Sequence, residues 1–167
     1  MLNIEPIKLL SGSHEDIGTT GQGCFMNVIA YLNGEAQITD RSPCVCVTIR
    51  PMAIWLNDMA NQQQRQQLIP FIERAMGSAT EDVTEMKRRI NLVVEFADEM
   101  AQYAAKYAQY AAEYAQYAAQ YAAEFSVLQE KLFQRGIKLM DNICPIAQKL
   151  DTCVIQRAEE LVALCKV

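Results

Sequence analysis

The stretch that decides the fold is YAAKYAQYAAEYAQYAAQYAA, residues 103–123, in which a seven-residue block occurs three times with small changes. Its tyrosines recur at alternating steps of four and three residues: Tyr103, Tyr107, Tyr110, Tyr114, Tyr117 and Tyr121. This is the spacing of the a and d positions of a heptad repeat, which form the seam of a left-handed coiled coil. The repeat therefore predicts a helix that packs lengthwise against another helix.

Alanine fills the side of this helix next to the tyrosines, at Ala104, Ala108, Ala111, Ala115 and Ala118. Only a narrow polar strip remains, which is not the pattern of a helix on a protein surface. We therefore expect homo-oligomerisation through both faces, as a helical bundle or coiled coil. If the tyrosines of one copy pack on the alanines of another, the contact joins two different surfaces of the chain. Repeating such a contact builds a closed ring or an open filament. The alternative is that the tyrosines pack on the chain's own returning helix, while the alanines dimerise or are covered by the N-terminal part.

Composition divides the chain near Gly77, because six of its seven glycines lie at or before that residue. Residues 1–77 are predicted to form a compact N-terminal helical domain. Ser78 and Glu81 then have the S-x-x-E spacing of a capping box, which marks a helix start. The remainder, residues 78–167, completes an all-α fold with a long helix over about 78–133, a turn over 134–145 and an antiparallel C-terminal helix over 146–166. At about 1.5 Å per residue, the long helix would span roughly 80 Å, more than the diameter of a globule of this size.

Short helices are expected within the N-terminal domain. The apolar run from Cys24 to Leu32 is followed by Asn33-Gly34, which is a helix stop. Ser42-Pro43 is typical of another helix start, and Pro51 is expected to break or kink that helix. Residues 44–49 form the one candidate strand.

Charge and hydropathy exclude several classes of protein. A net charge of −5 and a pI near 4.9 argue against a nucleic-acid binder. The chain has no apolar run of about 18 residues, so no membrane partner is expected, and its first residues lack the pattern of a secretory signal. The cysteines of the C-terminal part sit in an apolar helical pattern, which indicates free thiols and a cytoplasmic location. The basic cluster at 87–89 follows acidic residues at helical spacing, which predicts ordinary charge pairs between residues three and four apart.

Four residues of the N-terminal part have the side chains of a zinc site: His14, Cys24, Cys44 and Cys46. One histidine and three cysteines make an acceptable ligand set. A C-x-C pair on a helix, however, turns its two sulfurs to nearly opposite sides, so only a loop or strand at 44–46 would let both bind. We therefore expect no cofactor, with zinc as the alternative.

Cys24 is also a candidate nucleophile. It follows Gly21-Gln22-Gly23 and would lie at a helix N-terminus, where the thiolate is favoured. His14 and Glu35 could supply the base and an orienting carboxylate. The competing interpretation is a core residue, because Cys24 opens the apolar run CFMNVIAYL.

The segment GCFMNVIAYLNGEAQITDRSPC, residues 23–44, resembles a set of small phage and bacterial proteins with no assigned activity. Their pattern has a loop histidine, then G-C-x-M, A-Y-L-x-G-E, D-x-P-x-C-V and N-D, and one residue more separates Asp40 from Pro43 here. The resemblance covers about half the chain. It implies a phage or mobile-element origin, which would place the protein in the host cytoplasm, and a shared site at Cys24, Glu35 and Cys44. The matching residues are His14, Gly23, Cys24, Met26, Ala30, Tyr31, Leu32, Gly34, Glu35, Asp40, Pro43, Cys44, Val45, Asn57 and Asp58.

Together these patterns favour a non-enzymatic, self-associating helical protein that acts as a structural or interaction scaffold. The expected partner is a further copy of the chain, in a ring or a bundle. One alternative is an oligomeric sponge that sequesters a nucleotide-like aromatic molecule between the tyrosines of neighbouring subunits. The other is a Cys/His-dependent enzyme or a zinc-stabilised N-terminal domain.

Overall fold

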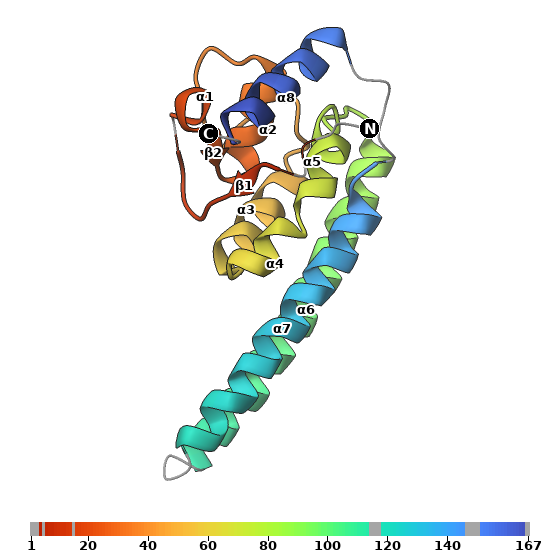
Figure 1. Ribbon diagram of the computed structural model, residues 1–167. Helices are drawn as coiled ribbons and strands as arrows, with labels where there is room; N and C mark the ends of the chain where they lie inside the picture. The colour runs from red at the N-terminus through yellow and green to blue at the C-terminus, as the bar shows by residue number, and fades with distance from the viewer. Residues whose placement is uncertain (1–3, 5, 15, 114–117, 146–150, 166–167) are drawn as a thin grey trace.

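A globular part of short helices carries a projecting pair of long helices (Figure 1). The computed structural model describes residues 4, 6–14, 16–113, 118–145 and 151–165, without the side chains of residues 107, 109–113 and 118–125. None of the described helices is long and apolar enough to cross a membrane. The elements are β1 (Lys8–Leu9), α1 (Ile17–Thr20), β2 (Gln22–Gly23), α2 (Phe25–Asn33), α3 (Ile49–Met59), α4 (Gln62–Gln66), α5 (Ile69–Ala75), α6 (Val83–Glu113), α7 (Ala118–Ile143) and α8 (Thr152–Leu164).

The chain is mostly helical, which confirms the all-α class except for one small sheet. β1 and β2 pair in parallel, with Lys8 opposite Gln22 and Leu9 opposite Gly23. The candidate strand at 44–49 is wrong, because this segment forms turns and then the first residue of α3. The helix expected to begin at Ser42-Pro43 does not form, and Pro51 does not break α3. It lies in the first turn of α3, where a missing N–H leaves no intrahelical hydrogen bond unmade.

The long helix expected over about 78–133 is instead two helices. α6 ends at Glu113, α7 begins at Ala118, and the two lie side by side as an antiparallel hairpin (Figure 1). Residues 114–117 lie outside the described residues. A single helix of that length would project into water, whereas the hairpin packs α6 against α7 within one chain, without the entropy cost of recruiting another.

The turn expected over 134–145 is also wrong, because α7 continues through Gly136 as far as Ile143. Close packing explains why a glycine stands there. A Cβ at this position would overlap Leu56 of α3, a fully buried side chain, so only glycine lets α7 approach α3 this closely. Phe133 and Met140, one turn on either side of Gly136, are buried in the same core.

The C-terminal helix does not return along the long helix as expected. α8 packs on α1 and α2 of the globular part instead. Its Arg157 donates from Nη1 to the carbonyl oxygen of Leu32 at 3.0 Å, which places a cation at the C-terminus of α2. Gly34, the left-handed cap of α2 at φ 73°, leaves the space that this guanidinium occupies. Residues 146–150 and 166–167, at the ends of the expected helix, lie outside the described residues.

The capping box expected at Ser78 and Glu81 does not start α6. The carboxylate of Asp82 does so, because its Oδ1 accepts from the backbone N–H groups of Thr84 at 2.8 Å and Glu85 at 3.4 Å. Ser78 is buried, and its hydroxyl accepts from the backbone N–H of Cys46 at 3.0 Å. Ser78, which the local pattern assigns to the helix cap, therefore makes a tertiary contact with Cys46 instead.

Substituting Gly136 by Ala tests the close approach of α7 and α3. We expect the free energy of unfolding to fall by about 1–2 kcal/mol, because overpacking costs about 1–3 kcal/mol and the better helix propensity of alanine recovers part of it. Urea denaturation measures this change. In a Leu56→Ala background, where space has been made, the same substitution should cost less or become stabilising. An equal loss in both backgrounds would contradict the contact.

Candidate functional site

One face of α6 is exposed and largely apolar, with Lys87 as a charged residue on it. We call the apolar residues of this face the outer stripe: Val83, Ile90, Val94, Ala97, Ala101, Ala104 and Ala108. They recur at steps of three, four or seven residues, so they share one side of the helix. The three branched side chains remain 62%, 44% and 51% exposed at Val83, Ile90 and Val94. Exposed apolar residues aligned in this way mark an interaction surface more often than scattered ones do.

The opposite side of α6 packs within the chain. Phe96 meets Trp55 of α3 edge to face, with ring centroids 5.6 Å apart, and Tyr103 lies half-buried two turns further along. At its described end, the tyrosine seam therefore faces the chain's own hairpin. Ala104 and Ala108 are exposed, as members of the outer stripe. The other candidate oligomerisation residues have undescribed side chains or lie outside the described residues: Tyr107, Tyr110, Tyr114, Tyr117, Tyr121, Ala111, Ala115 and Ala118.

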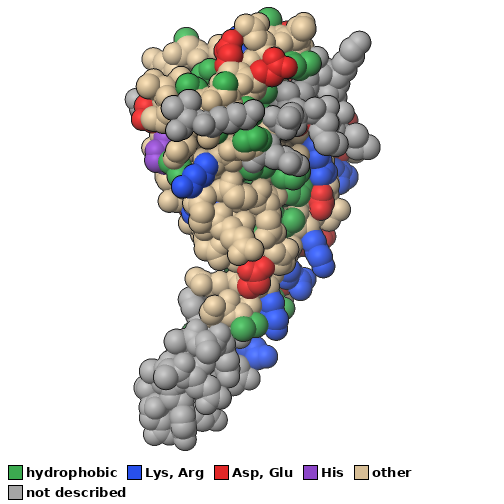
Figure 2. Space-filling view, viewed as in Figure 1, with side chains coloured by type: hydrophobic (Ala, Val, Ile, Leu, Met, Phe, Trp, Pro, Cys, Tyr) green, Lys and Arg blue, Asp and Glu red, His purple; other side chains and the backbone are tan. Residues whose placement is uncertain are grey.

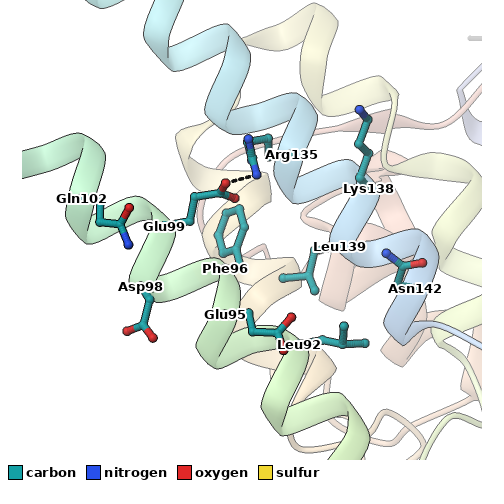
Figure 3. Close-up of a pocket in the computed structure, with 10 residues that line it drawn as sticks. All are labelled: Leu92, Glu95, Phe96, Asp98, Glu99, Gln102, Arg135, Lys138, Leu139 and Asn142. Carbon is teal, nitrogen blue, oxygen red and sulfur yellow. Dashed lines mark ion pairs between the residues drawn. The ribbon is translucent and has the colours of Figure 1, made fainter.

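A groove of about 610 Å³ lies between α6 and α7, beside the outer stripe (Figure 3). Its apolar lining comes from Leu92, Phe96 and Leu139. Acidic side chains of α6 and basic side chains of α7 line the rest, and Glu99 pairs with Arg135 across the helices. Lys and Arg side chains also follow one edge of the hairpin in Figure 2. The acidic groups of α6 oppose an anionic ligand, so this groove gives the nucleotide sponge no support.

Cys24 and His14 do not form an activated pair. Burial raises the pKa of the Cys24 thiol, and the nearby Asp58 and Asp40 carboxylates oppose its ionisation further, although the backbone N–H groups of Asn27 and Met26 act in the other direction. The His14 ring is held by a 2.8 Å contact from Nε2 to the carbonyl oxygen of Ser11. Because a carbonyl accepts only, Nε2 is the donor in this contact, which leaves Nδ1 as the ring's acceptor.

Cys24 instead has a structural role. It is the N-cap of α2, where its sulfur accepts from the backbone N–H of Asn27 at 3.4 Å. The helix start was predicted correctly, but the expectation of a favoured thiolate at this position is opposed by the burial of the side chain. A small cavity of about 80 Å³ adjoins Cys24, and Asp40, Asn57 and Asp58 also line it.

Glu35 and Cys44 meet through Ser42. The Ser42 hydroxyl donates to Oε1 of Glu35, and its oxygen lies 3.1 Å from the sulfur of Cys44. These residues, which the resemblance marks, therefore lie together in a loop. Cys24 lines the separate cavity described above, together with Asp40, Asn57 and Asp58.

Cys46 is the thiol that its surroundings favour as a thiolate. Burial raises its pKa, but the backbone N–H of Thr48, the guanidinium of Arg89 and the backbone N–H of Ile49 lower it by more, so the pKa lies below the ordinary value. Thr48 and Ile49 form the start of α3, where backbone N–H groups favour an anion. Cys46 also lines a cavity of about 230 Å³ with Arg50 and Thr80.

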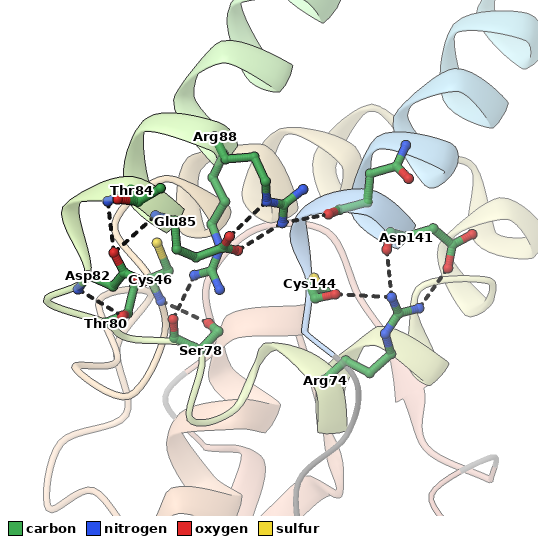
Figure 4. A network of polar contacts seen from close by, with 12 residues as sticks. Cys46, Arg74, Ser78, Thr80, Asp82, Thr84, Glu85, Arg88, Asp141 and Cys144 are labelled. Carbon is green, nitrogen blue, oxygen red and sulfur yellow. Dashed lines mark hydrogen bonds and ion pairs between the residues drawn. The ribbon is translucent and has the colours of Figure 1, made fainter.

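Arg89 connects this thiol to the base of the hairpin, where Ser78 and Glu85 lie near Cys46 (Figure 4). It is buried and donates to Oε1 of Glu85 at 2.7 Å and to the carbonyl oxygen of Ser78 at 2.7 Å. The hydrogen bonds from Arg88, and then from Arg89, lower the pKa of Glu85 to about 2. The sequence predicted these ion pairs, but it did not indicate the burial of Arg89, because helical spacing shows which charges are neighbours and not which side chain is buried.

The expected zinc ligands are not gathered into one site. Among the described residues, no group of three or more His, Cys, Asp or Glu side chains is placed to hold a metal ion. Cys44 and Cys46 lie in turns before α3, which the zinc alternative required, yet the two side chains have different neighbours. Ser42 contacts Cys44, whereas Arg89 acts on Cys46. All six cysteines are free.

Comparisons with protein-family models, with curated proteins and with solved structures found no match to this chain.

The pH dependence of stability tests the assignment of the thiolate to Cys46. Its pKa lies below the ordinary value of 9.0, so its contribution to stability is present above pH 9.0 and is lost as the pH falls through the lower pKa of the folded state. We expect the difference in unfolding free energy between wild type and Cys46→Ser to grow between about pH 7 and pH 9. Urea denaturation across this range measures it.

Cys144 supplies a control of opposite sign. Burial raises the pKa of this thiol to about 12, so its contribution is present below 9.0 and is lost as the pH rises towards 12. The difference between wild type and Cys144→Ser should therefore shrink above about pH 9. Two variants with the same pH slope would show that Cys46 is not held as a thiolate.

Proposed function

We propose that the protein is a self-associating helical scaffold and that the hairpin of α6 and α7 is its assembly element. The observation that carries the proposal is the outer stripe, which runs along α6 from Val83 to Ala108 with its branched residues exposed. Across these residues the stripe spans roughly 38 Å at about 1.5 Å per residue. This length covers more than three heptads, which suits a coiled-coil contact.

Burial of the outer stripe would be favourable and specific. A fully buried valine or isoleucine side chain gains about 1.5–3 kcal/mol over an exposed one, and Val83, Ile90 and Val94 have much of that gain still to make. The alanines at the distal end let a second backbone approach closely. Polar and charged residues of α6, such as Asn91, Asp98 and Gln102, are exposed outside the stripe, where they would remain solvated.

The geometry favours association through alanines over a tyrosine-to-alanine ring. Tyr103 faces the chain's own hairpin, whereas Ala104 and Ala108 face outward. This favours the alternative in which α6 packs within the chain and its alanine face dimerises, although α6 packs on α7 and not on the C-terminal helix. Free cysteines are consistent with the proposed cytoplasmic setting, and a phage or mobile-element origin stays a prediction from the resemblance.

Substituting Ala101 by Glu tests the proposal, with Gln102→Glu as the matched control. Both positions are exposed and adjacent on α6, but only Ala101 belongs to the outer stripe. We expect sedimentation equilibrium to give an oligomer for wild type and for Gln102→Glu. Ala101→Glu should weaken association by about a hundredfold, because an uncompensated charge in an interface costs about 3 kcal/mol or more.

Two results would overturn the proposal. A wild-type chain that stays monomeric at micromolar concentration would exclude self-association as its function. An equal loss of association in the Ala101 and Gln102 variants would show that assembly uses another surface. Circular dichroism of each variant confirms that the monomer has kept its helical content.

A further inference from the structure

We infer that a second copy of the chain pairs with α6 in the antiparallel direction, with Ile90 of each copy opposite Ala101 of the other. This inference rests on the proposed function, because it specifies the partner and the register of the same surface. In that register Val94 lies opposite Ala97, and Val83 lies opposite Ala108. The two-fold axis passes between Glu95 and Phe96.

The order of residue sizes along the outer stripe favours this direction. The branched residues Val83, Ile90 and Val94 all lie towards the globular part, and only alanines follow towards the distal end. In a parallel pair, branched residues would face branched residues and alanines would face alanines, so the helices would have to diverge or leave voids. Protein interfaces are close-packed, and voids forfeit contacts. An antiparallel pair sets each branched side chain against an alanine, which keeps one helix separation along the contact.

The spacing of the outer stripe is also symmetric about its centre. From Val83 through Ile90, Val94, Ala97 and Ala101 to Ala108, the steps are seven, four, three, four and seven residues. A copy that runs in the opposite direction therefore places its stripe on the same positions. The remaining member, Ala104, falls opposite the exposed Lys87 of the other copy, whose aliphatic stem can cover a methyl group while its ammonium stays in water.

This symmetry identifies the occupant as a second copy. A two-fold interface must be complementary to itself, since residue i contacts residue j and residue j contacts residue i. Alternating steps of four and three residues read the same in both directions, so the spacing permits such a pair, and the order of sizes satisfies it because each branched residue meets an alanine. A small ligand does not fit this surface, because ligand sites are concave and the groove of the hairpin has other lining residues.

Disulfide trapping distinguishes the two directions. Ile90→Cys and Ala101→Cys are made separately in a Cys153→Ser background, which removes the exposed native thiol. In the antiparallel register, equivalent positions lie about 16 Å apart along the axis, whereas a disulfide joins Cα atoms about 4.4–6.8 Å apart. We expect neither variant to form a cross-linked dimer alone under mild oxidation. An equimolar mixture should give the mixed dimer, identified by intact mass, as the main product.

Each other outcome overturns a defined part of the inference. Efficient cross-linking of Ile90→Cys alone and of Ala101→Cys alone would show a parallel pair. A mixture that stays uncross-linked although sedimentation shows an oligomer would show a different register or surface, and the proposed function would stand. A monomer by sedimentation in all the variants and in the background chain would remove the proposed function itself. The Cys153→Ser chain, oxidised in parallel, shows the cross-linking due to the remaining cysteines.

Discussion

The packing of α7 against α3 is the contact on which the rest of the structure depends. Gly136 removes the side chain that would hold these helices apart, and the buried Leu56 fills the space. α7 also packs along α6, so this one contact fixes the base of the whole hairpin against the globular part. Arg74 of α5 reinforces the end of α7, where it binds the carboxylate of Asp141 at 2.6 Å and the carbonyl oxygen of Cys144 at 3.1 Å (Figure 4).

This arrangement leaves α6 with one used face and one free face. Its inner face packs on α7 and α3 through residues such as Phe96, so this face finds its contacts within the chain. The outer stripe remains in solvent because nothing in the described chain is positioned to cover it. α6 is apolar on two sides. One side packs inside the hairpin, and the other is available as a surface for assembly.

Two N-terminal cysteines lie at helix starts, yet the structure shifts the pKa of their thiols in opposite directions. The sequence identified Cys24 as a helix-start thiol, and the structure confirms the start but raises the pKa through burial. Cys46 lies at the start of α3 beside a buried arginine. There the hydrogen bonds and the positive charge lower the pKa of the thiol by more than burial raises it. No local pattern distinguishes the two, because the guanidinium that acts on Cys46 comes from α6, more than forty residues later. The bounds of α2 were predictable from the apolar run and the Asn33-Gly34 stop, which are local signals.

The sequence by itself determined that the chain is mostly helical, that the described parts of the tyrosine repeat are helical and that alanine occupies the positions next to the tyrosines. These properties follow from the periodicity of side chains along a backbone, which needs no tertiary contact. Only the tertiary structure decided that the long helical region folds back on itself, that Gly136 belongs inside a helix and that α8 packs on α2 and α1. The reversal falls within a repeat that contains neither Gly nor Pro, so no local signal marks it, and the direction of the chain there depends on which partner covers the seam.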